Sequence, residues 1–473
     1  MSSPRTRFVA LALVSAGLYL LYFHGLDAVG ILSADEPRYA SIGRAMALTG
    51  DFVTPRLWGE PWFEKPPLLY WMTAVAFRLG LSEHLAPRLP VACLSVAFLA
   101  FFAWRVRQEF GARAAAAATL VLGASAGWLA YSFVAVTDLP LAVFFGVAML
   151  SAGAWLRGGD RRWLPAAGAS LGMAMLAKGL VPLVLAACLA PAAGRRVTAL
   201  LHPRFWLPLV AMAGPWYAAC TLVNGRAFVD EFFLVHHFGR FSSEALQHVQ
   251  PGWFYVPVLA GALFPWIPLA VLAGGRRQEG LSLFWLWLVW GFLFFSLSTN
   301  KLPGYLLPLL PAAAVLLGVA WDRAGQTRWP LAASVLLLGA AGPIAAILPE
   351  ALATGLSRAA APVWHPSWVL AVAAAGVVAA LPKDRALAAA AVCAMAAICF
   401  LKTAALPALE ASVSPRTLWR EAAQSGDRPC MEPTVHRAWR YGLNYYAIVP
   451  LAECGEETAG RRIVPGQPRP RIE

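Results

Sequence analysis

Apolar runs of membrane-spanning length recur along most of the chain, with short polar segments between them. Each run holds roughly 17–25 residues, which is enough to cross a hydrocarbon core as a helix that satisfies its own backbone hydrogen bonds. The pattern predicts an all-α polytopic membrane protein with about thirteen spans. Their expected ranges are 8–23, 85–104, 114–130, 139–156, 163–177, 180–193, 205–223, 252–274, 281–298, 304–321, 330–348, 366–382 and 387–406.

The first apolar run follows Arg5 and Arg7. A signal peptide begins similarly, but no small-residue cleavage site follows, so we expect an uncleaved first helix. Arginine-containing short loops alternate along the chain on the side of this N-terminus, and the positive-inside rule makes that side cytoplasmic. The long loops 24–84 and 224–251 and the polar C-terminal tail then lie outside, which is the periplasm for a protein of the inner membrane.

Composition agrees with this topology, since 59% of the 473 residues are hydrophobic and only 13% are charged. The net charge of +13 does not indicate nucleic-acid binding, because most cations lie in short loops where topology explains them. No internal repeat and no pair of matched broken helices is visible, which disfavours a repeat-built transporter. We expect the protein to act as a monomer.

Two regions outside the spans are expected to form folded structure. In the first outer loop, helical spacing of apolar residues from Tyr39 to Met46 and an apolar run over 66–79 predict two helices that lie in the membrane interface. The expected domains are a membrane core, 1–407, and a small α+β periplasmic domain, 408–473. Cys430 and Cys454 lie in this tail; an oxidising compartment suits a disulfide between them, but the sequence leaves the pairing open.

Carboxylates mark two places where the chain leaves the membrane on the outer side. Asp35 and Glu36 lie where the first outer loop begins a helix, and Asp138 lies at the mouth of a later span. One interpretation is helix capping, since Asp at such a position accepts backbone hydrogen bonds. The other is a catalytic or substrate-binding role, because a carboxylate at a membrane boundary needs a partner or a task.

Cations and aromatic residues occupy the neighbouring outer turns. Glu64 and Lys65 precede two prolines, where the lysine suits an anionic phosphate and the glutamate suits a cation. An interfacial lysine that snorkels to lipid headgroups is the alternative. Two further outer turns contain Lys178 and the pair Lys301 and Tyr305.

The outer loop 224–251 is rich in possible metal ligands and charges: Asp230, Glu231, His236, His237, Arg240 and His248. A zinc-like divalent ion held with Glu64 is one interpretation. Neighbouring histidines point in different directions on a helix, so at most one of them is expected to bind a metal. A surface histidine cluster without metal is the alternative.

Several of these motifs occur in one order that resembles a known family. The lipid A aminoarabinose transferases and their relatives, which share the GT-C membrane fold with protein O-mannosyltransferases, show similar motifs over about the first 320 residues. The first-loop set is the most specific. The motifs here are DEPRY at 35–39, GDFVTPR at 50–56, FEKPPLLYW at 63–71, APRLP at 86–90, TDLP at 137–140, LAKG at 176–179, HFGRF at 237–241 and KLPGYLLP at 301–308.

The resemblance implies a GT-C fold, a polyprenyl-phosphate sugar donor and an active site that faces outward. Carried over residue by residue, it implies catalytic roles for the two aspartates and donor-phosphate binding by the cations and a tyrosine. Glu64 and His237 look like a metal-binding pair, although His236 stands where aminoarabinose transferases often have an acidic residue. The implied assignments are Asp35 and Asp138 as catalytic residues and Lys65, Arg240, Lys178, Lys301 and Tyr305 as phosphate ligands.

These observations favour an inverting glycosyltransferase that takes a sugar from a polyprenyl (undecaprenyl) phosphate and transfers it to an envelope acceptor, a glycolipid such as lipid A. A lipid phosphate is a good leaving group, so cations that stabilise its developing charge matter more than a general acid. Asp35 is the candidate base for an acceptor hydroxyl. The alternatives are a protein O-glycosyltransferase with the same donor chemistry and a non-catalytic transporter of lipid-linked sugars.

Overall fold

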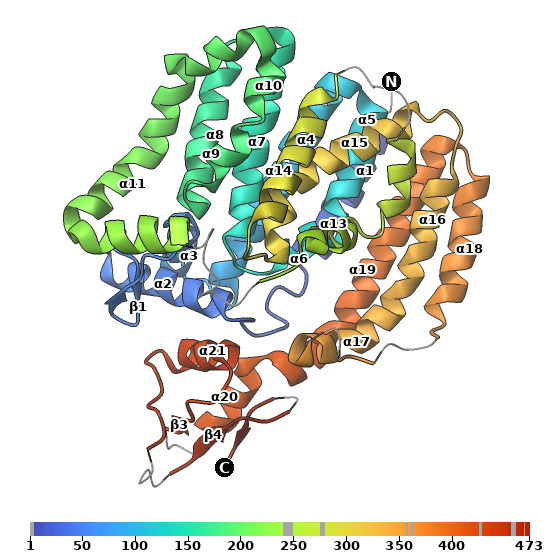
Figure 1. Ribbon diagram of the computed structural model, residues 1–473. Helices are drawn as coiled ribbons and strands as arrows, with labels where there is room; N and C mark the ends of the chain where they lie inside the picture. Colours follow the sequence, from blue (N-terminus) through green and yellow to red (C-terminus); the bar gives the residue numbers. More distant parts are fainter. Residues whose placement is uncertain are drawn as a thin grey trace.

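The computed structural model shows a bundle of helices with a small domain below one end (Figure 1). It describes residues 4–239, 249–274, 280–355, 358–360, 364–424, 428–455, 460–467 and 469–473. In these ranges seven helices are long and apolar enough to cross a membrane, or eight if one bent pair counts as a span, and four shorter apolar helices accompany them. The all-α membrane fold is confirmed, and the count of thirteen spans stays a prediction.

The membrane part runs from the N-terminal helix to the long helix that precedes the small domain. Its helices are α1 (Pro4–Leu18), η1 (Tyr19–Phe23), α4 (Leu85–Phe110), α5 (Ala112–Gly123), α6 (Ala126–Phe133), α7 (Asp138–Gly158), α8 (Trp163–Lys178), α9 (Val181–Ala186), α10 (Leu189–Ala193), η2 (Gly194–Leu201), α11 (Pro203–Val229), η3 (Asp230–Gly239), η5 (Gly252–Phe254), α13 (Tyr255–Leu263), η6 (Ile267–Leu272), α14 (Ser282–Leu297), η7 (Pro303–Leu309), α15 (Leu310–Arg323), α16 (Trp329–Leu337), η8 (Leu338–Ala340), α17 (Ala341–Thr354), α18 (Ser367–Ala380) and α19 (Lys383–Val413).

Two expected spans are interrupted. The run 114–130 forms α5 and α6, which are bent by 56°, because Ser125 between them has an extended backbone. The run 252–274 is divided near Pro265 into α13 and η6. The two breaks meet, since the amide of Ala126 donates to the carbonyl oxygen of Phe264 at 2.9 Å. This bond satisfies the amide of Ala126 and the carbonyl oxygen of Phe264, which a regular helix would have satisfied internally.

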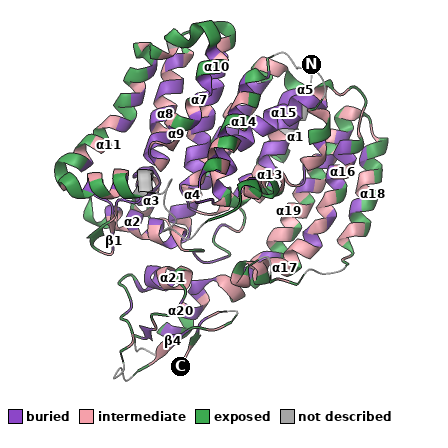
Figure 2. Ribbon diagram, viewed as in Figure 1, coloured by how far each residue is buried: buried purple, intermediate pink, exposed green. Residues whose placement is uncertain are grey.

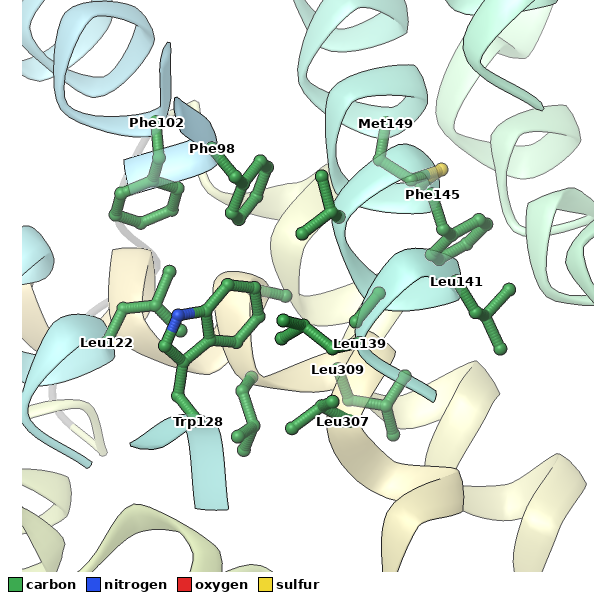
Figure 3. Packing of buried hydrophobic residues seen from close by; sticks show 14 of the residues in the cluster. Phe98, Phe102, Leu122, Trp128, Leu139, Leu141, Phe145, Met149, Leu307 and Leu309 are labelled. Carbon is green, nitrogen blue, oxygen red and sulfur yellow. The ribbon is translucent and has the colours of Figure 1, made fainter. Parts of the chain in front are cut away.

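The centre of the bundle is formed by α7 and by the span Pro303–Arg323, which joins η7 and α15. Of the residues in their most apolar stretches, 83% and 94% are buried. The outer helices α11 and α19 instead expose apolar faces (Figure 2), as expected for surfaces in contact with lipid tails. Close to the break between α5 and α6, Trp128 packs near Leu122, Leu139 and Leu307 (Figure 3). Its ring centroid lies 5.3 Å from that of Phe98. This core fixes the outer ends of α6 and α7, where the candidate site lies.

Small residues allow α8 to approach α11 closely. Gly168 and Gly172 are four residues apart and therefore share one face of α8. A Cβ atom built on Gly168 would lie 1.9 Å from the carbonyl oxygen of Phe205, and one on Gly172 would lie 2.7 Å from that of Leu209. Side chains at these positions would push the helices apart, so the spacing fixes the position of α8, which ends at Lys178.

The first outer loop folds over the ends of the membrane helices. It contains the two expected interfacial helices, α2 (Asp35–Thr49) and α3 (Leu68–Arg78). Between them β1 (Arg56–Leu57) pairs with β2 (Glu60–Pro61) in an antiparallel hairpin. The helices pack against each other closely, since a Cβ on Gly43 would lie 2.6 Å from the side chain of Thr73. The loop is therefore an ordered cover that carries most of the candidate site.

The C-terminal domain is a small α+β unit, as expected. Its helices are α20 (Pro415–Ala423) and α21 (Arg437–Ala447), and its sheet has the order β3-β4-β5, with β3 (Cys430–Met431) parallel to β4 (Arg462–Val464) and β5 (Arg471–Ile472) antiparallel to it. Cys430 and Cys454 form a disulfide, a pairing that the sequence alone did not decide. The expected domain boundary after residue 407 falls inside α19, which continues to Val413.

The domain is attached to the first outer loop by buried polar contacts. The hydroxyl of Tyr446 accepts from the backbone amide of Ile31 at 2.9 Å and lies 3.0 Å from Nε2 of His84. The guanidinium of Arg44 donates to the carbonyl oxygen of Tyr445 at 3.0 Å and lies 4.0 Å from the centre of its ring. Arg416 donates to the carbonyl oxygens of residues 27 and 28. These contacts hold the C-terminal domain against the first outer loop.

Acidification is expected to weaken this attachment through His84. Burial first, and then the positive charges of Arg416 and Arg88, lower the pKa of His84 from 6.5 to about 4. In the unfolded chain this histidine therefore binds a proton near pH 6.5, whereas in the folded protein it binds one only near pH 4. Stability should be full above pH 6.5 and fall by about 2–3 kcal/mol towards pH 4.

Unfolding of the wild type and of His84→Gln, followed across this pH range, measures the effect. Glutamine can keep a hydrogen bond to Tyr446 but does not titrate. The variant should lose less stability than the wild type between pH 6.5 and 4. Equal pH dependence in both proteins would contradict the role given to His84.

Candidate active site

A buried ion pair fixes the start of α2, where the first candidate carboxylates lie. Glu36 and Arg88 are both fully buried, and the guanidinium donates from Nε and Nη2 to the two carboxylate oxygens at 2.7 and 2.8 Å. Glu36 also accepts from the backbone amides of Leu32 and Ala135. Glu36 is therefore not a helix cap: it joins the first outer loop, α4 and the segment before α7.

Asp35 belongs to a cluster of alternating charges within the first outer loop. Its carboxylate pairs with Arg38, one turn further along α2, while the residue before it, Ala34, is the N-cap and makes no side-chain capping bond. Nη1 of Arg38 donates to Glu64 at 2.7 Å, and Nζ of Lys65 donates to the other Glu64 oxygen at 3.2 Å. The capping interpretation of Asp35 does not hold in this structure. The Asp35 side chain is 44% exposed, so it is accessible to a substrate.

A second cluster forms where α7 begins and α8 ends. Nζ of Lys178 donates to Oδ1 of Asp138 at 2.6 Å, and it lies 4.6 Å from the ring centre of Tyr305. Both charged side chains are mostly buried, at 12% and 16% exposure. Asp138 is the first residue of α7 and follows the N-cap, Thr137, which makes no side-chain capping bond. The partner of Asp138 is Lys178. Three residues named separately from the sequence thus lie together.

Tyr131 of α6 lies beside the second cluster, because its hydroxyl and the carboxylate of Asp138 both approach Gly304. The charge of Asp35 also acts on this tyrosine. A Cβ atom on Gly304 would lie 2.6 Å from the Tyr131 hydroxyl and 2.7 Å from Oδ1 of Asp138, so glycine at this position allows both polar groups to approach the η7 backbone. The two candidate catalytic aspartates therefore belong to one region.

The remaining predicted ligands differ in how far the structure describes them. Lys301 is buried, and its Nζ donates to the carbonyl oxygens of Gln250, at 3.0 Å, and Ser298. This ammonium is thus held by backbone at the edge of the site. Arg240 lies outside the described residues, and so does the side chain of His237. The roles given to these two residues stay predictions.

The predicted metal pair lies only partly within the described residues, because the side chain of His237 is outside them. No group of three or more possible metal-binding side chains occurs among the described residues. Both oxygens of Glu64 already face cationic side chains, Arg38 and Lys65, and a divalent cation at the same carboxylate would meet their repulsion. The metal pair of Glu64 and His237 stays a prediction, and no catalytic step below depends on it.

Three residues of the site were not assigned a role from sequence. Arg38 follows Asp35 by three positions, and this spacing places the two side chains on one helical face, so the ion pair was predictable. Tyr131 lies in an apolar run, and Tyr441 lies in the tail; neither spacing nor charge indicated the site. The ring of Tyr441 lies 5.1 Å from the guanidinium carbon of Arg38.

Comparisons with known proteins agree with the geometry. Residues 64–217 match the family model described as dolichyl-phosphate-mannose-protein mannosyltransferase. The undecaprenyl phosphate-alpha-4-amino-4-deoxy-L-arabinose arabinosyl transferase of Serratia proteamaculans is 32% identical over 330 residues, 65% of this chain and 58% of that protein. The Pseudomonas aeruginosa enzyme of the same name is 33% identical over 348 residues, 67% of this chain and 60% of that protein. The chain thus spans about three fifths of the length of these curated relatives.

A solved structure extends the similarity to nearly the whole chain. The crystal structure of ArnT from Cupriavidus metallidurans bound to undecaprenyl phosphate superposes with a TM-score of 0.74 at 27% identity, covering 96% of this chain and 87% of that chain. Together with the charged clusters at one membrane face, this defines a multi-pass membrane protein of the GT-C fold. The resemblance to the aminoarabinose arabinosyl transferases that the sequence motifs indicate is therefore confirmed.

Proposed function

We propose that this protein transfers a sugar from a polyprenyl-phosphate donor to a cell-envelope acceptor, a glycolipid such as lipid A, on the periplasmic face of the inner membrane. The observation that carries the proposal is the pair of ionic clusters at one membrane face, Asp35–Arg38–Glu64–Lys65 and Asp138–Lys178. A lipid-phosphate headgroup lies at this depth when its tail is in the bilayer. Relatives named for an undecaprenyl-phosphate sugar support the same donor class.

The proposed reaction is a single displacement. An acceptor oxygen bonds to the anomeric carbon as the bond from that carbon to the phosphate oxygen breaks, and the electron pair stays on the departing phosphate. Lys65 and Lys178, with Arg240, stabilise this charge. Asp35 takes the proton of a hydroxyl acceptor. Inversion at the sugar follows, and a glycosyl–enzyme adduct would contradict this path.

The proposed orientation places the N-terminus in the cytoplasm and the C-terminal domain in the periplasm. The arginine-containing short loops support it through the positive-inside rule. The disulfide between Cys430 and Cys454 also supports it, because such bonds persist in oxidising compartments such as the periplasm. We propose a monomer as the active form.

A protein acceptor is the second candidate. The match of residues 64–217 to a family described as protein mannosyltransferase favours it specifically. The donor chemistry and the site would be the same, so only the acceptor differs. Glycosylation of envelope lipid and of envelope protein in a deletion strain, compared with the parent, separates the two.

The transfer reaction tests the proposal with the purified full chain in detergent, mixed polyprenyl-phosphate sugars and an envelope lipid extract. The wild type should form a glycosylated lipid, and Lys65→Ala should lower the rate at least about tenfold, because removal of a phosphate-stabilising cation costs more than about 1.4 kcal/mol in the transition state. Lys383→Ala, at the opposite end of the bundle, is the matched control. If the protein binds the donor but transfers the sugar to no acceptor, the glycosyltransferase proposal is contradicted and a transporter of lipid-linked sugars is favoured.

A further inference from the structure

The guanidinium of Arg38 is held at all of its edges. Nε donates to the carbonyl oxygen of Ala34 at 2.9 Å, Nη1 to Glu64 at 2.7 Å and Nη2 to Asp35. The side chain is only 11% exposed. One arginine therefore sets the positions of two carboxylates of the candidate site, and its own position depends on what covers its faces.

Aromatic rings cover those faces, and one ring comes from the other domain. The guanidinium carbon lies 5.8 Å from the ring centre of Tyr39 and 5.5 Å from that of Trp62, both in the first outer loop. Tyr441 of α21 is nearer, at 5.1 Å. A cation over an aromatic face is attracted by the ring, more strongly when water is excluded. Tyr441 lies far outside the residues that match the family model, 64–217.

The first outer loop holds a second ring behind Tyr441. Trp58 stacks on it, with ring centres 5.8 Å apart and planes 25° apart. Trp58 and Gly59 are the two turn residues of the β1–β2 hairpin, and both have positive φ, +53° and +97°. A bulky residue rarely adopts this conformation, and where it does, its surroundings hold it there. Tyr441 of the C-terminal domain therefore contacts both Arg38 and Trp58 of the first outer loop.

The helix that carries Tyr441 is fixed to the first outer loop about one turn further on. Arg44 donates to the carbonyl oxygen of Tyr445, and Tyr446 accepts from the amide of Ile31. These bonds lie on the side of α21 that faces the loop, so movement of the C-terminal domain would carry Tyr441 away from Arg38.

We propose that Tyr441 is a positioning residue of the active site, and that the C-terminal domain thereby completes the site by holding Arg38 against Asp35 and Glu64. This inference rests on the proposed sugar transfer. Without the ring, water reaches one face of the guanidinium, the ion pairs become weaker, and the two carboxylates lose their fixed positions. The consequence is a slower chemical step with little change in donor binding.

The experiment compares Tyr441→Leu, Tyr441→Phe and Tyr441→Met in the full chain, measuring kcat, the KM for the donor and the unfolding temperature. The leucine and methionine variants should lose about tenfold in kcat, from a cation–π contact of about 1.4 kcal/mol, with the donor KM changed less than about twofold. Phenylalanine keeps the ring and should retain wild-type kcat. Arg440→Gln is the matched control: it changes a residue of the same helix and removes the ion pair with Glu453 and the hydrogen bonds to the carbonyl oxygens of residues 432 and 433.

Each possible result either supports or contradicts the positioning role of Tyr441. Wild-type kcat in the leucine variant overturns the inference, and so does an equal loss in the phenylalanine variant, which would assign the effect to the hydroxyl. A purely structural role would lower the unfolding temperature and reduce kcat alike in Arg440→Gln. If the leucine variant does not fold, the methionine variant gives the same comparison with a side chain of similar length. Absence of transfer by the wild type would contradict the proposed function instead.

Discussion

Glu36→Ala is expected to lower the free energy of unfolding by about 3–5 kcal/mol, because it leaves a buried guanidinium without its counter-charge. Arg88 is fully buried and donates two hydrogen bonds to Glu36. The variant also leaves the amides of Leu32 and Ala135 without their acceptor, and each unsatisfied buried group adds to the cost. The free energy can be measured by denaturant titration in mixed micelles.

The matched control removes a carboxylate from an exposed pair. Asp160 forms an ion pair with Arg162, whose side chain is 89% exposed, and ion pairs of exposed side chains contribute little to stability. Asp160→Ala should therefore have little effect on unfolding. A loss below about 1 kcal/mol in Glu36→Ala would mean that Arg88 finds other partners, and the central place given to this ion pair would be wrong.

The membrane helices were predictable because a spanning helix must be both apolar and long. Spans such as α4, α7 and α19 therefore lie where the hydrophobic runs predicted them. The break between α5 and α6 was not predictable, because Ser125 is a small residue inside an apolar run. Its bend depends on a hydrogen bond to residue 264, and contacts between distant segments leave no local pattern.

The same distinction applies to the site. Motif resemblance indicated Asp138 and Lys178 separately, but their ion pair joins residues 40 positions apart, and only the packing of α7 against α8 brings them together. Glu36 was interpreted as a possible cap because its partner Arg88 lies 52 positions away, in another helix. Tyr441 comes from a different domain, and a contact between domains cannot be inferred from spacing along the chain.

Asp35→Asn is expected to reduce kcat by about 10²–10⁴-fold with an acceptor whose nucleophile is a hydroxyl, because the amide cannot take the proton. With an acceptor that offers an ionised phosphate, no base is needed, and only the positioning by Arg38 is disturbed. The reduction should then be much smaller. Comparing the two acceptor classes with the same purified variant therefore reports what Asp35 does as well as whether it matters.

Asp27→Asn is the matched control, since it makes the same change of charge at an exposed position in the same loop and should leave kcat unchanged. A large loss with both acceptor classes would assign Asp35 to substrate positioning instead of proton transfer. Wild-type activity of Asp35→Asn with a hydroxyl acceptor would exclude it as the base. Asp138, which lies close to Tyr131 and pairs with Lys178, would then be the carboxylate to test next. Among the described residues it is the other carboxylate to which a catalytic role is given.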